Sequence, residues 1–363
     1  MDEFIKMDHG SGGVKTGELI DEIIRPAFSN PALNALGDGA ILDISGFGLK
    51  SGVFGNNFSE GKFNGDALSS SLACGNIAFS TDSFVIDPLF FPGGNIGKLA
   101  VCGTANDIAM CGARPLWMSL SLIMEEGLPI ESLKQIIESI SVQAAELGVQ
   151  IVTGDTKVVE RGKGDGIYIN TAGIGVLEYA GLTPDAIEAG DRIIVSGPIG
   201  DHGTAIMIAR EDLGIESGLK SDCMALYPLA KAAWEAGNGG VHCLRDATRG
   251  GVVTTLNEFT EGRSYGIQLN EADLPVRPEV KAACSMLGLD PLYCANEGRM
   301  LCAVKAENAD AVLKAIKACP GGEGAAIIGR AADEYAGRVV LKNHLGANRI
   351  LTKLTGAQLP RIC

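Results

Sequence analysis

Residues 79–109 of this chain read FSTDSFVIDPLFFPGGNIGKLAVCGTANDIA. With the three residues before it, the segment 76–86 is an apolar run typical of a β-strand that ends in a polar turn. The glycine-rich loop 91–98 leads into a second apolar stretch, and its backbone N–H groups could face a phosphate at the start of a helix. It is not a Walker A loop, because Lys98 is followed by Leu99. The stretch predicts mixed α/β structure with a candidate anion site.

The flanking segments continue this mixed α/β pattern. Residues 131–147 place several leucines and isoleucines on one helical face, which predicts a helix. The other predicted strands are 149–156, 166–179, 338–343 and 348–354, and the other predicted helices are 203–213, 223–236 and 305–318. At 181–203 a polar loop, an apolar strand and a glycine-flanked turn begin the pattern again. This restart suggests a second structural unit.

The length and composition predict a globular protein of about two domains. The chain has 363 residues, of which 46% are hydrophobic and 20% charged. We expect an N-terminal domain at 1–181, a C-terminal domain at 182–354 and a flexible tail at 355–363. Residues 45–75 are rich in Gly, Ser and Asn without a sustained period, which predicts a long exposed loop or lid in the first domain.

Charge and hydropathy exclude several classes of partner. The net charge of −14 argues against nucleic-acid and anionic-membrane binding, since both require a basic surface. The N-terminus lacks the apolar run of a signal peptide, and no stretch of about 18 apolar residues could span a membrane. We therefore expect a cytoplasmic protein.

The chain contains ten cysteines, and its last residue, Cys363, is one of them. No CxxC pair occurs, and the spacings match no zinc or iron–sulfur pattern. Most of the nine internal cysteines lie in apolar runs, where a free cysteine packs as a small hydrophobic residue. Cys363 differs, because it ends a short tail that could extend roughly 25 Å beyond Gly356.

Acidic residues recur in short motifs at the expected ends of strands and loops: Asp38, Asp82, Asp107, Asp155 and Asp246. Carboxylate oxygens suit Mg²⁺, which typically binds a few carboxylates together with substrate phosphates and water. A single aspartate at a turn is more typical of capping. The repetition of the motif favours a metal–phosphate site, provided that the fold brings the motifs together.

Other polar residues are candidates for binding phosphate or for acid–base chemistry. Lys157, Arg245 and Arg249 could neutralise phosphate charge, or they could pair with surface carboxylates. His202 lies in the polar turn GDHG, where a histidine can act as an acid, a base or a donor. Glu297, in ANEG, follows an apolar segment and is a candidate base, although a solvated turn glutamate is an alternative interpretation.

Taken together, these motifs resemble one family. The segments HGSGG, FSTDSFVIDPLFFPGGNIGKLAVCGTANDIA, TGDTKVVERG, GDHG, RDATRGG, ANEG and the terminal PRIC are similar to the HypE family of hydrogenase-maturation factors. These are carbamoyl dehydratases of the superfamily that contains aminoimidazole ribonucleotide (AIR) synthetase. The resemblance runs from about residue 7 to the end in the family's order, and the longest segment and the PRIC terminus are its most specific parts.

The resemblance implies an AIR-synthetase-like fold of two α/β domains, with a homodimer that builds a β-barrel across its interface. It also implies ATP and Mg²⁺ as cofactors, bound in a cleft near that interface. By their motifs, the implied metal-binding residues are Asp38, Asp82, Asp107 and Asp246. The implied nucleotide-binding residues are Gly12, Gly13, Asn106, Gly154, Asp155, Arg245 and Arg249, and the implied catalytic residues are Cys363, Glu297, His202 and Lys157.

The implied reaction explains a cysteine at the end of the chain. Cys363 would receive a carbamoyl group from HypF, and its thiocarbamate would be dehydrated to a thiocyanate with ATP. The cyanide would then pass to iron in a HypC–HypD complex during assembly of [NiFe]-hydrogenase. A group that enters one active site and leaves for another protein needs a mobile carrier, and a short tail supplies one.

Two other functions compete with this interpretation. A selenophosphate synthetase of the same superfamily would carry a Cys or selenocysteine near its N-terminus, but the corresponding loop HGSGG has neither. A non-catalytic sulfur or redox carrier could use Cys363 alone, but it would leave the aspartate motifs unexplained. Measuring ATP hydrolysis with and without Cys363 separates these functions.

Overall fold

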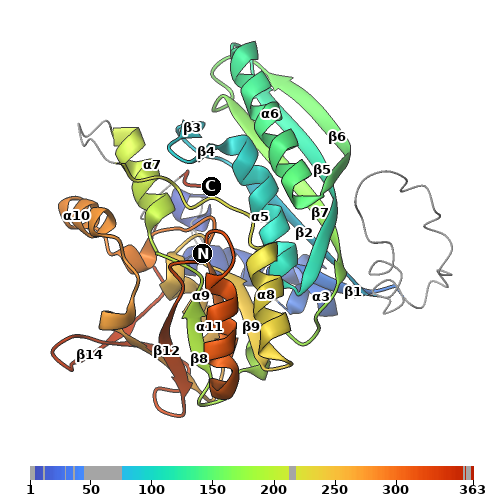
Figure 1. Ribbon diagram of the computed structural model, residues 1–363. Helices are drawn as coiled ribbons and strands as arrows, with labels where there is room; N and C mark the ends of the chain where they lie inside the picture. The colour runs from blue at the N-terminus through green and yellow to red at the C-terminus, as the bar shows by residue number, and fades with distance from the viewer. Residues whose placement is uncertain are drawn as a thin grey trace.

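The computed structural model describes residues 5–10, 13–28, 30–35, 37–44, 76–211, 218–354, 356 and 361–363. Two large sheets with packed helices make up most of the molecule (Figure 1), which confirms the mixed α/β class. The predicted loop 45–75 lies outside the described residues. Within the described part of the chain, no helix combines the length and the apolar character needed to cross a membrane.

The first sheet has five strands in the order β1-β2-β7-β5-β6. All neighbouring pairs are antiparallel except β5 and β6, which helix α6 connects. The strands are β1 (Ala40–Asp43), β2 (Asn76–Phe84), β5 (Ala113–Glu125), β6 (Gln150–Val159) and β7 (Ile167–Leu177), and a small separate hairpin is formed by β3 (Phe90–Phe91) and β4 (Gly94–Asn95). Strands β2, β6 and β7 confirm the sequence prediction, whereas β5 was not predicted.

Helices α5 (Ile96–Met110) and α6 (Ile130–Leu147) cover one face of this sheet (Figure 1). Gly97 allows their close approach, because a Cβ atom at this position would lie 2.5 Å from the carbonyl oxygen of Ile136. The opposite face carries exposed apolar side chains, including Phe79 and Ile123. Short helical segments precede the sheet: α1 (Val14–Leu19), a π-helical turn (Ile20–Ile24), α2 (Arg25–Phe28) and α3 (Pro31–Asn34).

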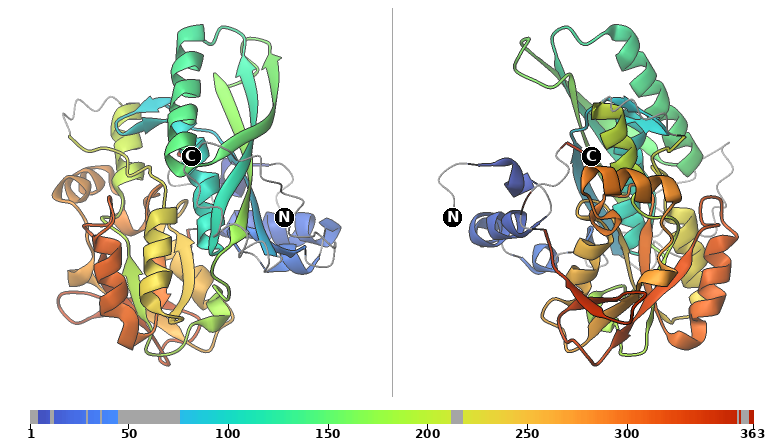
Figure 2. Two further views of the ribbon diagram at one scale, coloured as in Figure 1. Left: turned by 45° about the vertical axis from the view of Figure 1, so that its right-hand side comes forward. Right: turned by 90° about the vertical axis from the view of Figure 1, so that its left-hand side faces the viewer.

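The second sheet has seven strands in the order β14-β13-β10-β12-β8-β11-β9. The strands are β8 (Arg192–Val195), β9 (Val241–Asp246), β10 (Gly266–Asn270), β11 (Met300–Val304), β12 (Ala326–Ala332), β13 (Val339–Lys342) and β14 (Asn348–Leu351). The helices of this part are α7 (Asp201–Glu211), α8 (Tyr227–Gly237), α9 (Gly251–Thr260), α10 (Pro278–Leu287) and α11 (Ala309–Lys317). Figure 2 shows this unit beside the first sheet and its helices.

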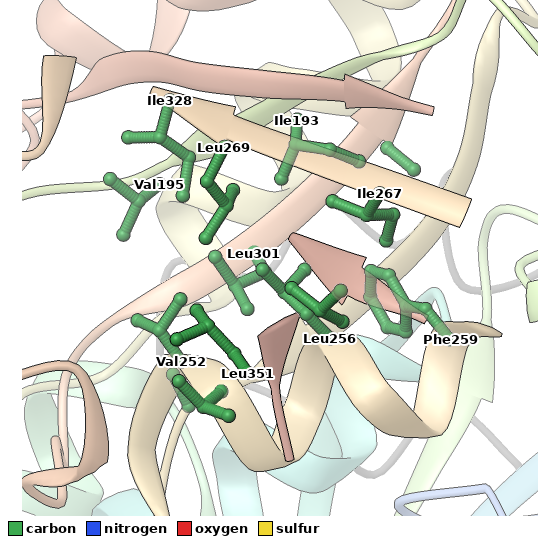
Figure 3. Packing of buried hydrophobic residues seen from close by; sticks show 14 of the residues in the cluster. Ile193, Val195, Val252, Leu256, Phe259, Ile267, Leu269, Leu301, Ile328 and Leu351 are labelled. Carbon is green, nitrogen blue, oxygen red and sulfur yellow. The ribbon is translucent and has the colours of Figure 1, made fainter. Parts of the chain in front are cut away.

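Helix α9 and the second sheet form a continuous apolar core (Figure 3). Val252, Leu256 and Phe259 of α9 pack with Ile193 of β8 and Leu301 of β11, and all five side chains are fully buried. The core fixes the position of the chain on either side of α9, and therefore of Asp246 at the end of β9.

The predicted helices of this part are present with shifted ends. Helix α8 begins at Tyr227 rather than at residue 223, because Pro228 occupies its first turn, where a missing N–H costs least. Helix α11 and strands β13 and β14 lie where the sequence predicts them. Nine cysteines lie in the described residues, all without a disulfide, and seven of the eight internal ones are buried, as predicted.

Candidate active site

Four of the predicted aspartates come together from both sheets. Asp38 precedes β1, Asp82 lies in β2, Asp107 lies near the end of α5, and Asp246 ends β9. The carboxyl groups of Asp82 and Asp107 lie near each other and interact electrostatically. Ser80 Oγ lies 2.6 Å from Asp107 Oδ2 and 3.0 Å from the carbonyl oxygen of Asp38, so it links these two segments.

Burial and mutual repulsion disfavour negative charge on this cluster. The pKa of Asp107 is raised well above its usual value, first by burial and then by the charges of Asp82, Asp246 and Asp38. The pKa of Asp246 is raised in the same way. Burial raises the pKa of Asp38 to about 6, although Arg245 opposes the shift. A bound cation would relieve this repulsion.

The donor set fits a magnesium ion that is completed by a nucleotide. Among the residues that the structure describes, no three His, Cys, Asp or Glu side chains form a ready-made coordination shell. Mg²⁺ commonly uses one or two carboxylates, with substrate phosphates and water filling the remaining positions. The clustered aspartates therefore suit a metal that arrives with its phosphates better than a metal held by protein alone.

Arg245 neutralises part of the cluster. Its Nε lies 3.1 Å from Asp38 Oδ1, and its Nη1 lies 2.7 Å from Glu258 Oε2. The guanidinium is held by two carboxylates, so Arg245 fixes the position of Asp38 at the edge of the cluster. Arg249 lies on the other side of the cluster and interacts electrostatically with Asp82 and Asp107.

Cys363 lies at the same place. Its thiol lies beside the carboxyl group of Glu297 and interacts electrostatically with Glu297, Arg249 and Asp82. Figure 1 shows the C-terminus between α7 and α5, which belong to the two halves of the molecule. Burial raises the pKa of the thiol, Arg249 opposes this effect, and the charges of Glu297 and Asp82 add to it.

Glu297 is a buried carboxyl group with spare hydrogen-bonding capacity. It lies in the segment before β11 and is 3% exposed, and its Oε1 has no hydrogen-bond partner in the described structure. Burial raises its pKa well above the usual value, and the nearby Cys223 and Asp246 raise it further. A carboxylate of raised pKa that faces a reactive sulfur is suited to accept a proton.

His202 holds the C-terminal tail. Its Nε2 lies 2.7 Å from the carbonyl oxygen of Ile362, and its Nδ1 lies 2.8 Å from Ser221 Oγ. A carbonyl oxygen only accepts hydrogen bonds, so Nε2 carries the proton and Nδ1 accepts from the serine. Burial lowers the pKa of His202 to about 4, which keeps the ring neutral. This geometry favours a positioning role for His202, and its predicted catalytic role stays a prediction.

Two predicted nucleotide-binding features are used within the protein. Asn95 caps α5 by accepting hydrogen bonds from the N–H groups of Gly97 and Lys98, so the loop 91–98 does not offer these donors to a phosphate. Asn106 donates to the carbonyl of Met224 and accepts from the N–H of Leu226. Asn106 therefore positions the segment before α8, and its predicted nucleotide-binding role stays a prediction.

The glycines of the HGSGG loop are only partly described. Gly13 is buried and precedes α1, while Gly12 lies outside the described residues. Val14, the first residue of that helix, donates its N–H to the carbonyl of Leu354, where the chain approaches its C-terminal tail.

The residues Gly154, Asp155 and Lys157 lie away from the cluster within one chain. They belong to strand β6, and the row Asp82–Thr171–Leu120–Gly154 crosses the sheet from β2 to β6. Three strand spacings separate its ends, which is about 14 Å. Lys157 forms an exposed ion pair of 2.7 Å with Asp155. A single chain does not place Lys157 beside Cys363, contrary to the predicted catalytic grouping.

Comparison with known proteins agrees with this architecture. Residues 66–177 match the model of the AIR synthase related protein N-terminal domain, and residues 188–342 match that of the corresponding C-terminal domain. The carbamoyl dehydratase HypE of Rhizobium leguminosarum is 44% identical over 360 residues, which cover 99% of this chain and 95% of the relative. The Escherichia coli carbamoyl dehydratase HypE is 45% identical, with 99% of both chains covered.

The chain belongs to the HypE family. Solved HypE structures share its fold, which confirms the AIR-synthetase-like prediction. The HypE of a HypE–HypF complex superposes with a TM-score of 0.80 at 41% identity and covers 93% of this chain and 99% of its own. A HypE in complex with ATP has a TM-score of 0.75 at 41% identity and covers 99% of this chain and 100% of its own.

The structure also shows residues near the site that the sequence interpretation missed. Asp222 Oδ1 accepts a hydrogen bond of 2.9 Å from the N–H of Glu297, and Arg299 Nε lies 3.5 Å from Asp222 Oδ2. Cys223 lies beside Glu297 and shares a hydrogen bond with Cys102. No sequence signal marks them, because they reach the site only through the folding of the segment between α7 and α8.

Proposed function

We propose that this protein is an ATP-dependent carbamoyl dehydratase. It would convert a carbamoyl group on Cys363 into a thiocyanate and supply the cyanide ligand for the iron of [NiFe]-hydrogenases. Full-length relatives named carbamoyl dehydratase HypE and a HypE structure with ATP support this function. The observation that carries it is the placement of Cys363 against Glu297, beside the aspartate cluster.

The chemistry follows from that placement. A thiocarbamate must lose its oxygen to become a thiocyanate, and oxide or hydroxide is a poor leaving group. When bound, Mg-ATP supplies a phosphoryl group to that oxygen, so that phosphate can leave. Glu297 is placed to take the N–H proton as the C≡N bond forms, and Arg249 can stabilise negative charge that develops beside the sulfur.

We assign the metal and nucleotide phosphates to the aspartate cluster. Asp82 and Asp107 would hold Mg²⁺, and Asp38 and Asp246 would supply the other carboxylates of the metal-binding cluster. Gly12, Gly13, Gly154, Asp155 and Arg245 stay proposed nucleotide-binding residues. The repulsion among the buried carboxylates supports this assignment, because a divalent cation removes it.

The uncovered face of the first sheet suits a homodimer. Phe79 and Ile123 are 40% and 44% exposed there, and a second copy of the sheet would bury them in the proposed barrel. This face also carries Asp155 and Lys157, so a dimer offers a route by which β6 could approach the site of the other copy. We propose HypF as the carbamoyl donor, HypC–HypD as the cyanide acceptor, and a cytoplasmic location.

The domain boundaries also stay proposals. We place the N-terminal domain at 1–181, the C-terminal domain at 182–354 and the tail at 355–363. The first sheet ends at Leu177 and the second begins at Arg192, which supports a boundary between them.

Intact-mass spectrometry tests the function. Protein incubated with the carbamoyl donor and ATP should gain a carbamoyl group and then lose one water. Cys363→Ser should gain nothing, because an alcohol is a far weaker nucleophile than a thiolate. A chain extended by a few residues beyond Cys363 should load but not lose water. An adduct on Cys363→Ser would overturn the assignment of the carrier.

A further inference from the structure

The tip of the C-terminal tail is held through its backbone. Ile362 forms an antiparallel bridge with Ile86, and the N–H of Asp87 donates to the carbonyl of Arg361 over 3.3 Å. His202 donates to the carbonyl of Ile362, and Arg210 Nη2 donates to that of Arg361 over 2.7 Å. Both carbonyl groups before Cys363 are therefore bound, from two different parts of the fold.

The charge of Arg361 is also recognised. Its Nη1 lies 2.6 Å from Asp165 Oδ2, and its Nη2 lies 3.0 Å from Asp87 Oδ2. Arg210 Nε donates to the carbonyl of Asp87 over 2.9 Å, which braces one of these carboxylates. The two carboxylates come from the turn after β2 and the turn before β7, so they form an exposed acidic site for a cationic side chain.

Ile362 supplies the apolar part of the contact. It is 3% exposed and belongs to the core cluster that contains Ile86 and Phe91. Arg361 has a left-handed backbone with a φ of 51°, so the chain turns just before Ile362. A slip by one residue would take Ile362 out of this cluster and move Cys363 away from Glu297. The basic side chain thus meets two carboxylates, the aliphatic side chain is buried in an apolar cluster, and the thiol packs against that cluster beside Glu297.

We propose that Asp87, Asp165, Arg210 and His202 form a peptide-binding site for a basic–aliphatic–cysteine tripeptide, which we call the tail cradle. It treats the end of the chain as a ligand and sets the register of Cys363 against Glu297. The use of this register for dehydration rests on the proposed function, whereas binding of the tail does not. The cradle residues are positioning residues, and the site should also accept the same tripeptide as a separate molecule.

Alkylation of Cys363 in the full-length protein measures occupancy of the cradle without any catalysis. Iodoacetamide reacts with an accessible thiolate, and cleavage after Lys353 releases a peptide that reports Cys363 alone. We expect slow alkylation in the native chain. Asp165→Asn, which removes one exposed ion pair, should accelerate it about two- to fivefold, and Arg361→Glu, which removes two and adds repulsion, should accelerate it about tenfold. The control Arg349→Ala removes an exposed pair with Asp290 and should leave the rate unchanged.

A competing peptide tests the binding site directly. The synthetic pentapeptide Leu-Pro-Arg-Ile-Ser, at about 10 mM to compete with a tethered tail, should accelerate alkylation of Cys363 in the native protein. The same peptide with Glu in place of Arg should not. Native rates in both Arg361→Glu and Asp165→Asn, or equal effects of the two peptides, would overturn the cradle.

The same variants separate the cradle from the proposed function. If the alkylation rates change as expected but native protein never dehydrates a loaded carbamoyl group, the cradle stands and the proposed function fails. If native protein dehydrates normally and the alkylation rates do not respond, the cradle fails alone. Melting temperatures of Arg361→Glu and Asp165→Asn near the native value would show that the exposed substitutions act on the tail rather than on folding.

Discussion

Replacing Glu297 by glutamine should stop dehydration without preventing loading of Cys363. The substitution keeps the shape of the side chain and removes its ability to accept a proton beside the sulfur. A positioned general base typically contributes 10²- to 10⁴-fold, which corresponds to about 3–5 kcal/mol of activation free energy. We therefore expect at least a 100-fold slower loss of water from the carbamoylated protein, on the order of the lower bound for such a base.

The same substitution should change how stability depends on pH. Because the pKa of Glu297 is raised in the folded state, its contribution to stability is fully present below its unfolded pKa and is lost as the pH rises through the folded pKa. Glu297→Gln has no such loss. In urea unfolding, its free energy of unfolding relative to the native protein should increase as the pH rises.

Single-turnover intact-mass spectrometry of the loaded protein supplies the rate. Glu261→Gln is the matched control, since Glu261 forms an exposed ion pair of 2.7 Å with Lys353 away from the site. It should dehydrate at the native rate. If Glu297→Gln also loses water at the native rate, Glu297 is not the base. If the difference in unfolding free energy between Glu297→Gln and the native protein is independent of pH, the pKa of Glu297 is not raised in the folded state.

Three further predictions concern the metal, the tail and the dimer. Asp107→Asn should stabilise the protein in the absence of Mg²⁺, because it removes repulsion from Asp82 and Asp246. The same variant should bind Mg-ATP more weakly in calorimetry. An unchanged Mg-ATP affinity would show that Asp107 does not belong to the site. The low pKa of His202, about 4, predicts that stability falls by up to about 3 kcal/mol between pH 6.5 and 4. His202→Gln should flatten that part of the unfolding curve, and an unchanged slope would contradict the prediction. Phe79→Asp should yield monomers in analytical ultracentrifugation, and a persistent dimer would exclude this face as the interface.

The elements with a clear period could be predicted from the sequence. Helix α6 shows one apolar face, and β2 combines an apolar run with a polar end, so both were located within a few residues. Strand β5 was missed because its run ARPLWMSLSLIME carries a proline at its third position and groups apolar residues at 115–118 and 122–124, so it alternates only over its middle. The start of α8 was misplaced because the apolar residues before Pro228 pack without being helical.

The site could be predicted as a set of motifs but not as a geometry. Each aspartate stood out in its own motif, whereas their repulsion arises only when β2, α5 and β9 meet. His202 could be recognised as a candidate, but a sequence does not show that its partner is the carbonyl of Ile362. The β6 residues belong to the family pattern, yet one chain leaves them across the sheet from Asp82.

The raised pKa of the docked thiol has a consequence for energy use by the protein. A thiolate is the reactive form of cysteine, and the surroundings of Cys363 keep its sulfur protonated. An empty carrier resting in the site is therefore a poor acceptor for a phosphoryl group. Once Cys363 carries a carbamoyl group, the oxygen of that group can accept the phosphoryl group. Under the proposed function, a loaded carrier would thus offer an acceptor oxygen that an unloaded carrier lacks, and nucleotide would not be spent on an empty tail.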